Sequence, residues 1–160
     1  MEQMNYKRRH TIKINSLQTR ELSLLLSFVW KESLDNEEWK EIEGLDGRYY
    51  ISSCGRVLSL CLDGYKIIQP FICGDGYCYV DLRKDGKDVK CRVHRLVADA
   101  FIDRAEGKTI VHHKDADRRN NNVSNLQWLT TTEHAAAHHQ INQERKELRE
   151  QTAADENLLS

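Results

Sequence analysis

Residues 109–139 read TIVHHKDADRRNNNVSNLQWLTTTEHAAAHH, and this stretch decides how the rest of the chain is interpreted. It places His112-His113 first, then Asn125, then His134 and His138. Two histidines four residues apart share one face of a helix, so His134 and His138 can turn toward one point. Imidazole is a common metal ligand, and a neighbouring imidazole can instead accept a proton from water. The spacing therefore predicts a one-metal site with a base beside it.

The same stretch predicts a strand, a loop, a second strand and a helix. Residues 109–111 are β-branched, residues 114–124 are polar and turn-prone, and residues 126–129 alternate as a strand does. Thr130, with Glu133 three residues later, fits a capping box, and strong helix formers follow without Pro or Gly. A ββα unit is expected.

Upstream of this unit the chain has short alternating runs separated by glycine turns. The expected strands lie at residues 49–51, 55–60, 65–68 and 77–82, with turns at Asp63-Gly64, Asp75-Gly76 and Asp85-Gly86. Apolar residues then recur at helical spacing from Val93 to Phe101. The expected fold class is α+β, with a small antiparallel β-rich N-terminal module followed by a ββα-metal core.

The composition fits one compact domain with extensions at either end. The 160 residues carry a formal net charge of -1, but local patches matter more than the sum. The 5 cysteines include no C-x-x-C pair, so neither a disulfide framework nor a zinc ribbon is expected. The most apolar stretch, residues 22–30, is shorter than the roughly 20 residues that a membrane span needs. A soluble intracellular protein without a membrane partner is expected.

Several blocks of the chain resemble a known family. Val111-His112-His113-Lys114-Asp115 with Asn120-Asn121, then residues 125–130 and His134, resemble the HNH motif of phage-type homing endonucleases, whose core is the His-Me finger. Residues 39–42, 49–52 and 55–59 resemble NUMOD4, a short DNA-binding module that often precedes HNH domains. Residues 93–98 with Phe101-Ile102 are similar to the helix that links the two. The resemblance implies a phage or mobile-element endonuclease acting on double-stranded DNA in the cytoplasm of an infected bacterium.

The resemblance also divides the chain. The expected parts are an N-terminal arm at residues 1–36, a NUMOD4-like module at 37–92, an HNH core at 93–140 and a charged helical tail at 141–160. The arm is expected to hold an amphipathic helix at residues 17–31. A homodimer or another protein partner through that helix stays open.

His113 is the expected general base, because a neutral imidazole can take a proton from water at physiological pH. Neighbouring side chains of an extended segment face opposite ways, so His112 and His113 would need a local bend to serve one site. By resemblance, Asn125 ties the loop together and so orients the base. Arg95 is expected to grip the scissile phosphate, with helix packing as the alternative.

The expected metal ligands are His112, His134 and, as a third candidate, His138. Homing nucleases of this type often have Asp or Asn before the base and Asn at the last position, whereas both are His here. Imidazoles favour Zn, Ni or Cu, although phosphate and water could complete a Mg site. A divalent metal is therefore expected, either Mg or Zn, with Mn or Ni as further candidates.

Basic side chains on the N-terminal module are expected to contact DNA phosphates, which gives affinity rather than sequence choice. These side chains are Arg56, Arg83, Lys84, Lys87, Lys90 and Arg92. One such site cuts one strand, so nicking is expected. The alternative is a non-catalytic DNA-binding or regulatory protein with a structural zinc, for which His139 or Asp115 would have to supply a fourth ligand.

Overall fold

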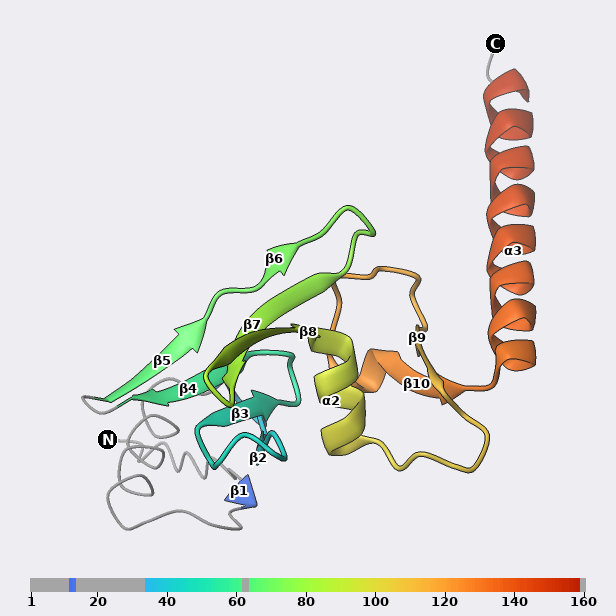
Figure 1. Cartoon of the computed structure of the whole chain (residues 1–160). Coiled ribbons are helices and arrows are strands. Elements are labelled where there is room, and N and C mark those ends of the chain that lie inside the picture. The colour runs from blue at the N-terminus through green and yellow to red at the C-terminus, as the bar shows by residue number, and fades with distance from the viewer. Residues whose placement is uncertain (1–11, 14–33, 62–63, 159–160) are drawn as a thin grey trace, which may run out of the picture.

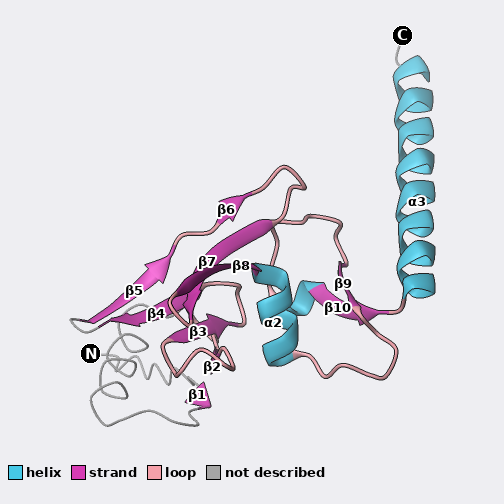
Figure 2. Ribbon diagram, viewed as in Figure 1, coloured by secondary structure: helices cyan, strands magenta, loops and turns pink. Residues whose placement is uncertain are grey.

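The computed structural model describes residues 12–13, 34–61 and 64–158, and Figures 1 and 2 show how its elements are arranged. Five strands form the first sheet in chain order: β1 (Ile12–Lys13), β2 (Trp39–Glu41), β3 (Tyr49–Ser52), β4 (Val57–Cys61) and β5 (Gly64–Ile68). The second sheet has three strands: β6 (Phe71–Ile72), β7 (Cys78–Lys84) and β8 (Lys87–Arg92). The remaining elements are α2 (Val93–Phe101), β9 (Ile110–His113), η1 (Val123–Asn125), β10 (Leu126–Leu129) and α3 (Thr131–Leu158). All strand pairs except β1 with β2 are antiparallel, which confirms the predicted α+β class.

The hairpin of β7 and β8 is closed by the predicted Asp85-Gly86 turn. Both residues have positive φ, +49° and +75°, which a two-residue turn of this kind requires. Lys84 pairs with Lys87 across it. Because this register fixes the faces of β7, Val80 and Leu82 are fully buried while Asp81 points to solvent.

Helix α2 packs against both sheets and against β9 and β10, so it lies between the β-rich module and the ββα unit (Figure 1). Its buried side chains Val93, Val97 and Ala98 join one core that also contains Ile51 of β3 and Trp128 of β10. The boundary expected at residue 92 therefore separates elements that share a single hydrophobic core.

A second apolar cluster lies on the other face of the five-stranded sheet. It is formed by Trp39, Tyr50, Leu58 and Leu60. Tyr50 and Leu58 are paired across β3 and β4, and paired residues share a face. The predicted core positions of Trp39 and Trp128 are confirmed, since their exposed fractions are 0% and 4%.

The ββα unit forms as predicted. β9 and β10 are antiparallel, with His112 opposite Gln127. The capping box begins α3, because Thr130 N donates to Glu133 Oε2 (2.7 Å) and Glu133 N donates to Thr130 Oγ1 (3.2 Å). The helix continues without a break to Leu158, within the expected tail, and projects away from the body (Figure 2). The helix expected at residues 17–31 lies outside the described residues, and no described helix is long and apolar enough to cross a membrane.

Candidate active site

Three imidazoles converge between β9 and the start of α3. His112 of β9 has its ring centroid 5.4 Å from that of His134 and 5.3 Å from that of His138. The Nε2 atoms of His134 and His138 lie 3.2 Å apart, one helical turn from each other. One ligand nitrogen from each of the three residues lies within 4.8 Å of the others, so the group can hold a metal ion.

The pKa values of His112 and His134 lie below the ordinary value of histidine. Burial lowers the pKa of His112, and the nearby charges of His134 and His138 lower it further. Burial likewise lowers the pKa of His134, with a contribution from His138. Only a neutral imidazole has the lone pair that a metal needs, so the lowered pKa values favour the ligand form.

His113 faces the other side of β9. Its ring centroid lies 5.1 Å from that of His94 and 5.9 Å from that of Tyr77. Its Nε2 lies 3.3 Å from Asn121 Oδ1, and both residues are buried. β9 stays a regular strand through His113, so the expected bend is absent from this described segment. His112 and His113 nevertheless line the same small cavity. Its other lining residues are Tyr77, Val111, Ala116, Arg118, His134 and His138.

Asn125 holds the loop between β9 and β10. Its Oδ1 accepts from Asp115 N (3.1 Å), and its Nδ2 donates to Asp115 Oδ1 and to Asn120 O (2.9 Å each). Although partial burial raises the pKa of Asp115, the hydrogen bonds from Asn120 and Asn125 bring it below its usual value. Asp115 is thus ionised and accepts hydrogen bonds from the side chains of Asn120 and Asn125. The contacts of Asn125 join both ends of the loop, which is the arrangement that a loop-tying role needs.

Three residues of the site escaped the sequence reasoning. His94 of α2 is 3% exposed, and burial followed by the charge of His113 lowers its pKa to about 3. Its ring packs against that of Tyr77 at 4.7 Å. The guanidinium of Arg118 lies 4.9 Å from the Tyr77 ring and donates to Asp75 O (2.7 Å). Arg118 could have been suspected because it is a basic residue in the polar loop after the histidine pair. Tyr77 lies in the connection between β6 and β7, far from that loop in the sequence.

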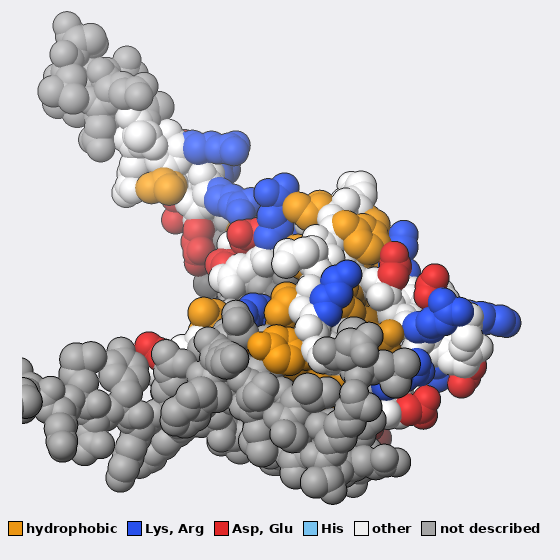
Figure 3. Space-filling model, turned by 90° about the vertical axis from the view of Figure 1, so that its left-hand side faces the viewer, with side chains coloured by type: hydrophobic (Ala, Val, Ile, Leu, Met, Phe, Trp, Pro, Cys, Tyr) orange, Lys and Arg blue, Asp and Glu red, His pale blue; other side chains and the backbone are white. Residues whose placement is uncertain are grey.

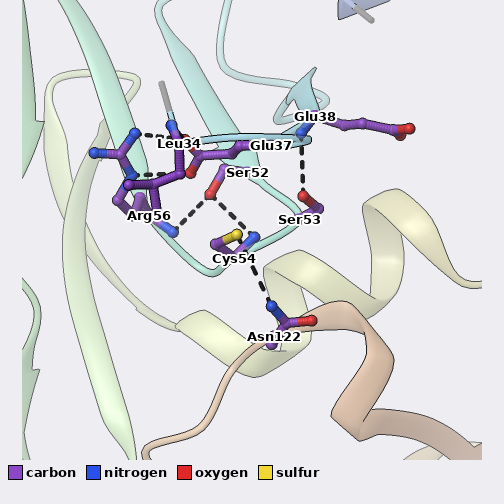
Figure 4. A network of polar contacts seen from close by, with 8 residues as sticks. All are labelled: Leu34, Glu37, Glu38, Ser52, Ser53, Cys54, Arg56 and Asn122. Carbon is purple, nitrogen blue, oxygen red and sulfur yellow. Dashed lines mark hydrogen bonds and ion pairs between the residues drawn. The ribbon is translucent and has the colours of Figure 1, made fainter. Parts of the chain in front are cut away.

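The other predicted arginines lie apart from the cavity lining. Arg95 is exposed on α2 and its Nη2 donates to Thr109 O (3.1 Å). Arg56 is held by Glu37, a fully buried carboxylate, through Nε at 2.8 Å and a second guanidinium nitrogen (Figure 4). This ion pair competes with a phosphate for Arg56. Hydrogen bonds from Arg56 and Leu34 outweigh burial and lower the pKa of Glu37, so the carboxylate is ionised.

The remaining predicted phosphate-contacting residues lie on the second sheet. Arg83, Lys84 and Lys87 are exposed at the hairpin end. Lys90 lies over the rings of Phe71 and Tyr79, while Arg92 donates to Tyr79 Oη (2.7 Å).

The ββα unit carries an adjacent histidine pair on its first strand, an Asn that bonds to the loop and histidines on its helix, as the resemblance to HNH endonucleases implied. Residues 91–136 match the HNH endonuclease family, and residues 37–83 match the NUMOD4 motif. The chain therefore carries an HNH endonuclease region behind a NUMOD4 motif, which confirms the resemblance drawn from the sequence.

Named relatives agree with this assignment. The chain is 41% identical over 93 residues to DNA endonuclease I-HmuI of Bacillus phage SP01, covering 58% of this chain and 52% of that protein. It is 30% identical over 115 residues to the uncharacterized HNH endonuclease L245 of Acanthamoeba polyphaga mimivirus, covering 69% of this chain and 34% of the relative. A solved structure of I-HmuI, described as DNA binding and cleavage by an HNH homing endonuclease, matches with a TM-score of 0.53 and 39% identity, covering 70% of this chain and 59% of that one. The chain thus spans about half the length of I-HmuI and a third of L245.

Proposed function

We propose that the protein is a metal-dependent endonuclease that hydrolyses phosphodiester bonds of double-stranded DNA and nicks one strand per encounter. The observation that carries the proposal is the convergence of three imidazoles, from His112, His134 and His138, in the same cavity as His113. Its homologues include an endonuclease of a Bacillus phage, which supports DNA as substrate and an infected bacterial cell as the place of action.

The proposed chemistry divides between the two sides of β9. Asn121 Nδ2 donates to Arg119 O (3.0 Å), so its Oδ1 faces the His113 ring and accepts from Nε2. The lone pair of the neutral ring is then on Nδ1, which can take a proton from the attacking water. A divalent metal held by the other three histidines would stabilise the negative charge on the phosphate and on the leaving 3′ oxygen.

The ligand set favours particular metals. Three imidazoles suit Zn, Ni or another transition ion better than Mg, which prefers carboxylate oxygen and water. We therefore propose Zn or Ni as better activators than Mg at equal concentration, with Mg or Mn active only where phosphate and water complete the coordination.

A series of cations and aromatic rings leads along the second sheet to the cavity. Lys90 lies over Tyr79, Arg92 lies 5.5 Å from the Tyr79 ring and 5.2 Å from the Tyr77 ring, and Arg118 covers Tyr77. We propose that the DNA backbone follows this series and that Arg118, at the cavity, contacts the scissile phosphate.

Basic and acidic side chains are interspersed on one face of the molecule. Figure 3 shows Lys and Arg there in patches interrupted by Asp and Glu. With a net charge of -1, attraction of DNA is expected to come from local groups of basic side chains rather than from the charge of the whole chain.

The number of candidate ligands bears on the choice between a nuclease and a protein with a structural zinc. A structural zinc site is closed by four protein ligands, whereas a catalytic site keeps a position open. Within the described part of the chain, the candidate group has three members, His112, His134 and His138. Three protein ligands would leave a coordination position open for water or phosphate, which supports catalysis over the non-catalytic alternative.

A supercoiled-plasmid assay tests the proposal. The wild type, His113→Ala and the control His139→Ala are each incubated with Mg, Mn, Ni or Zn and with chelator, and metal binding is followed by calorimetry. The proposal expects nicked circles from the wild type and the control, lost with chelator and in His113→Ala. An intact plasmid under every metal, together with DNA binding in a gel shift, would favour the non-catalytic alternative.

A further inference from the structure

The turn between β3 and β4, residues 52–56, contacts the loop of the ββα unit. Ser53 O accepts from Val123 N (2.8 Å), and Asn122 Nδ2 lies 3.9 Å from Cys54 Sγ (Figure 4). Gly55 lies against Asn121 so closely that a Cβ at position 55 would be 2.8 Å from Asn121 Cβ and 3.2 Å from its carbonyl oxygen. The N-terminal module thus fits directly against the loop that follows the histidine pair.

Hydrogen bonds within the N-terminal module fix the conformation of the turn. The buried hydroxyl of Ser52 accepts from Cys54 N (3.3 Å) and Arg56 N (3.0 Å), and Gly55 N donates to Ser52 O (3.0 Å). Glu37 fixes the Arg56 side chain, as described above. Gly55 has φ +82°, a conformation that glycine adopts without strain. With this anchoring, the turn presents a fixed surface to Asn121 rather than an adaptable one.

Asn121 connects this surface to His113. Its backbone and Cβ meet Gly55, while its side-chain Oδ1 lies 3.3 Å from His113 Nε2. A displacement of Asn121 by the turn would therefore change the hydrogen bond that selects which ring nitrogen of His113 carries the proton.

We propose that the turn at residues 52–56 is a positioning element for His113, acting through Asn121. The module that precedes the HNH region would then supply part of the catalytic geometry as well as a DNA-binding surface. This inference rests on the proposed nuclease function for its effect on rate, but its effect on the His113 ring can be measured without any metal or DNA.

Gly55→Ala is the direct test, because the added methyl group meets Asn121. Gly107→Ala is the matched control: Gly107 has φ +77°, and a Cβ there meets nothing within 4 Å. The two substitutions impose similar backbone strain and differ in the contact. Thermal unfolding of both variants shows whether the strain is indeed matched.

The first readout is the proton position on His113 in the metal-free full-length protein. Long-range ¹H–¹⁵N correlation spectra at a pH where the ring is neutral distinguish the two tautomers, and His113→Ala identifies the signal. We expect the Nε2–H form in the wild type and in Gly107→Ala, and a mixture or the other form in Gly55→Ala. A Gly55→Ala spectrum identical to that of the control would overturn the inference.

The second readout separates kcat from KM in plasmid nicking. Gly55→Ala is expected to lower kcat by on the order of 10- to 100-fold with KM within about twofold, since small misplacements of a catalytic group cost about that much. Gly107→Ala should leave both near wild type. Equal kcat values for the two variants would contradict the inference, whereas an inactive wild type with a shifted His113 signal would contradict only the nuclease proposal.

Val123→Pro keeps the inference testable should Gly55→Ala fail to fold. It removes the N–H that donates to Ser53 O, and proline is tolerated at the first position of a helical turn such as η1. A change in the His113 signal would support the inference. A folded Val123→Pro protein with a wild-type His113 signal would count against it.

Discussion

His112 and His113 are adjacent residues of the same type, yet the two sides of β9 give them different surroundings. On one side, His112 meets two further imidazoles whose ligand atoms converge. On the other side, His113 meets the rings of Tyr77 and His94 and the amide of Asn121. The strand alternation produces this separation without a bend. Under the proposed function, one dipeptide would supply both a metal ligand and a base to the same cavity.

The largest difference between the two sides of β9 should appear in the rate constant for DNA cleavage. His113→Ala is expected to lower kcat by about 10²- to 10⁴-fold, the usual contribution of a general base, while leaving metal affinity near wild type. Calorimetric metal titration and single-turnover cleavage together measure both effects. His139→Ala serves as the control. Loss of metal binding in His113→Ala would mean that metal binding and proton transfer are not divided between the two sides of β9.

Substitutions on the His112 side of β9 are expected to weaken metal binding. His134→Ala removes one of three converging imidazoles and is expected to weaken metal binding by on the order of 100-fold, because the binding energy of a site is shared among its ligands. Calorimetry of the metal-free protein measures this loss directly. His138→Ala should behave similarly, and unchanged affinity in both variants would exclude the group as the metal site.

A smaller effect on activity is expected from Arg118, which lines the cavity shared by His112 and His113. Arg118→Gln removes the guanidinium above Tyr77 and should raise KM for DNA by about 10-fold or more, the cost of a lost hydrogen bond to a charged group. Arg95→Gln is the matched comparison on α2. Equal effects of the two substitutions in steady-state cleavage would restore Arg95 as a phosphate-binding residue.

The last effect concerns stability rather than activity. The folded state lowers the pKa of His94 from 6.5 to about 3, so the fold favours its neutral form. Between these values the unfolded chain binds a proton that the folded protein does not, so stability falls as pH decreases from 6.5 toward 3, by up to about 1.4 kcal/mol per pH unit. His94→Gln should flatten this dependence.

Urea unfolding of the wild type and His94→Gln between pH 7 and pH 4 measures the difference between their pH slopes. Parallel slopes would show that His94 is protonated as easily in the fold as in the unfolded chain.

The sequence predicted those features that depend on local chemistry. The Asp85-Gly86 turn requires two positive φ values, and Asp and Gly both tolerate them. The capping box of Thr130 and Glu133 needs only a spacing of three residues. The convergence of His134 and His138 follows from one helical turn, and their approach to His112 follows from the ββα order.

Long-range packing could not be predicted in the same way. Arg56 is expected at a DNA surface by its charge, but Glu37, 19 residues earlier, holds it. Tyr77 reaches His113 from the connection between β6 and β7, and Gly55 reaches Asn121 from the turn between β3 and β4. These contacts depend on how both sheets and the ββα unit pack against α2. The spacing of residues along the chain does not indicate that arrangement.

Single-turnover nicking at increasing metal concentration tests most directly whether β9 separates metal binding from proton transfer. The measurement compares His112→Ala with His113→Ala at saturating DNA. His112→Ala is expected to need more metal and to recover much of its rate at high concentration, whereas His113→Ala stays slow at every concentration. The same metal dependence in both variants, or recovery of His113→Ala at high metal, would contradict the assignment of different roles to the two histidines.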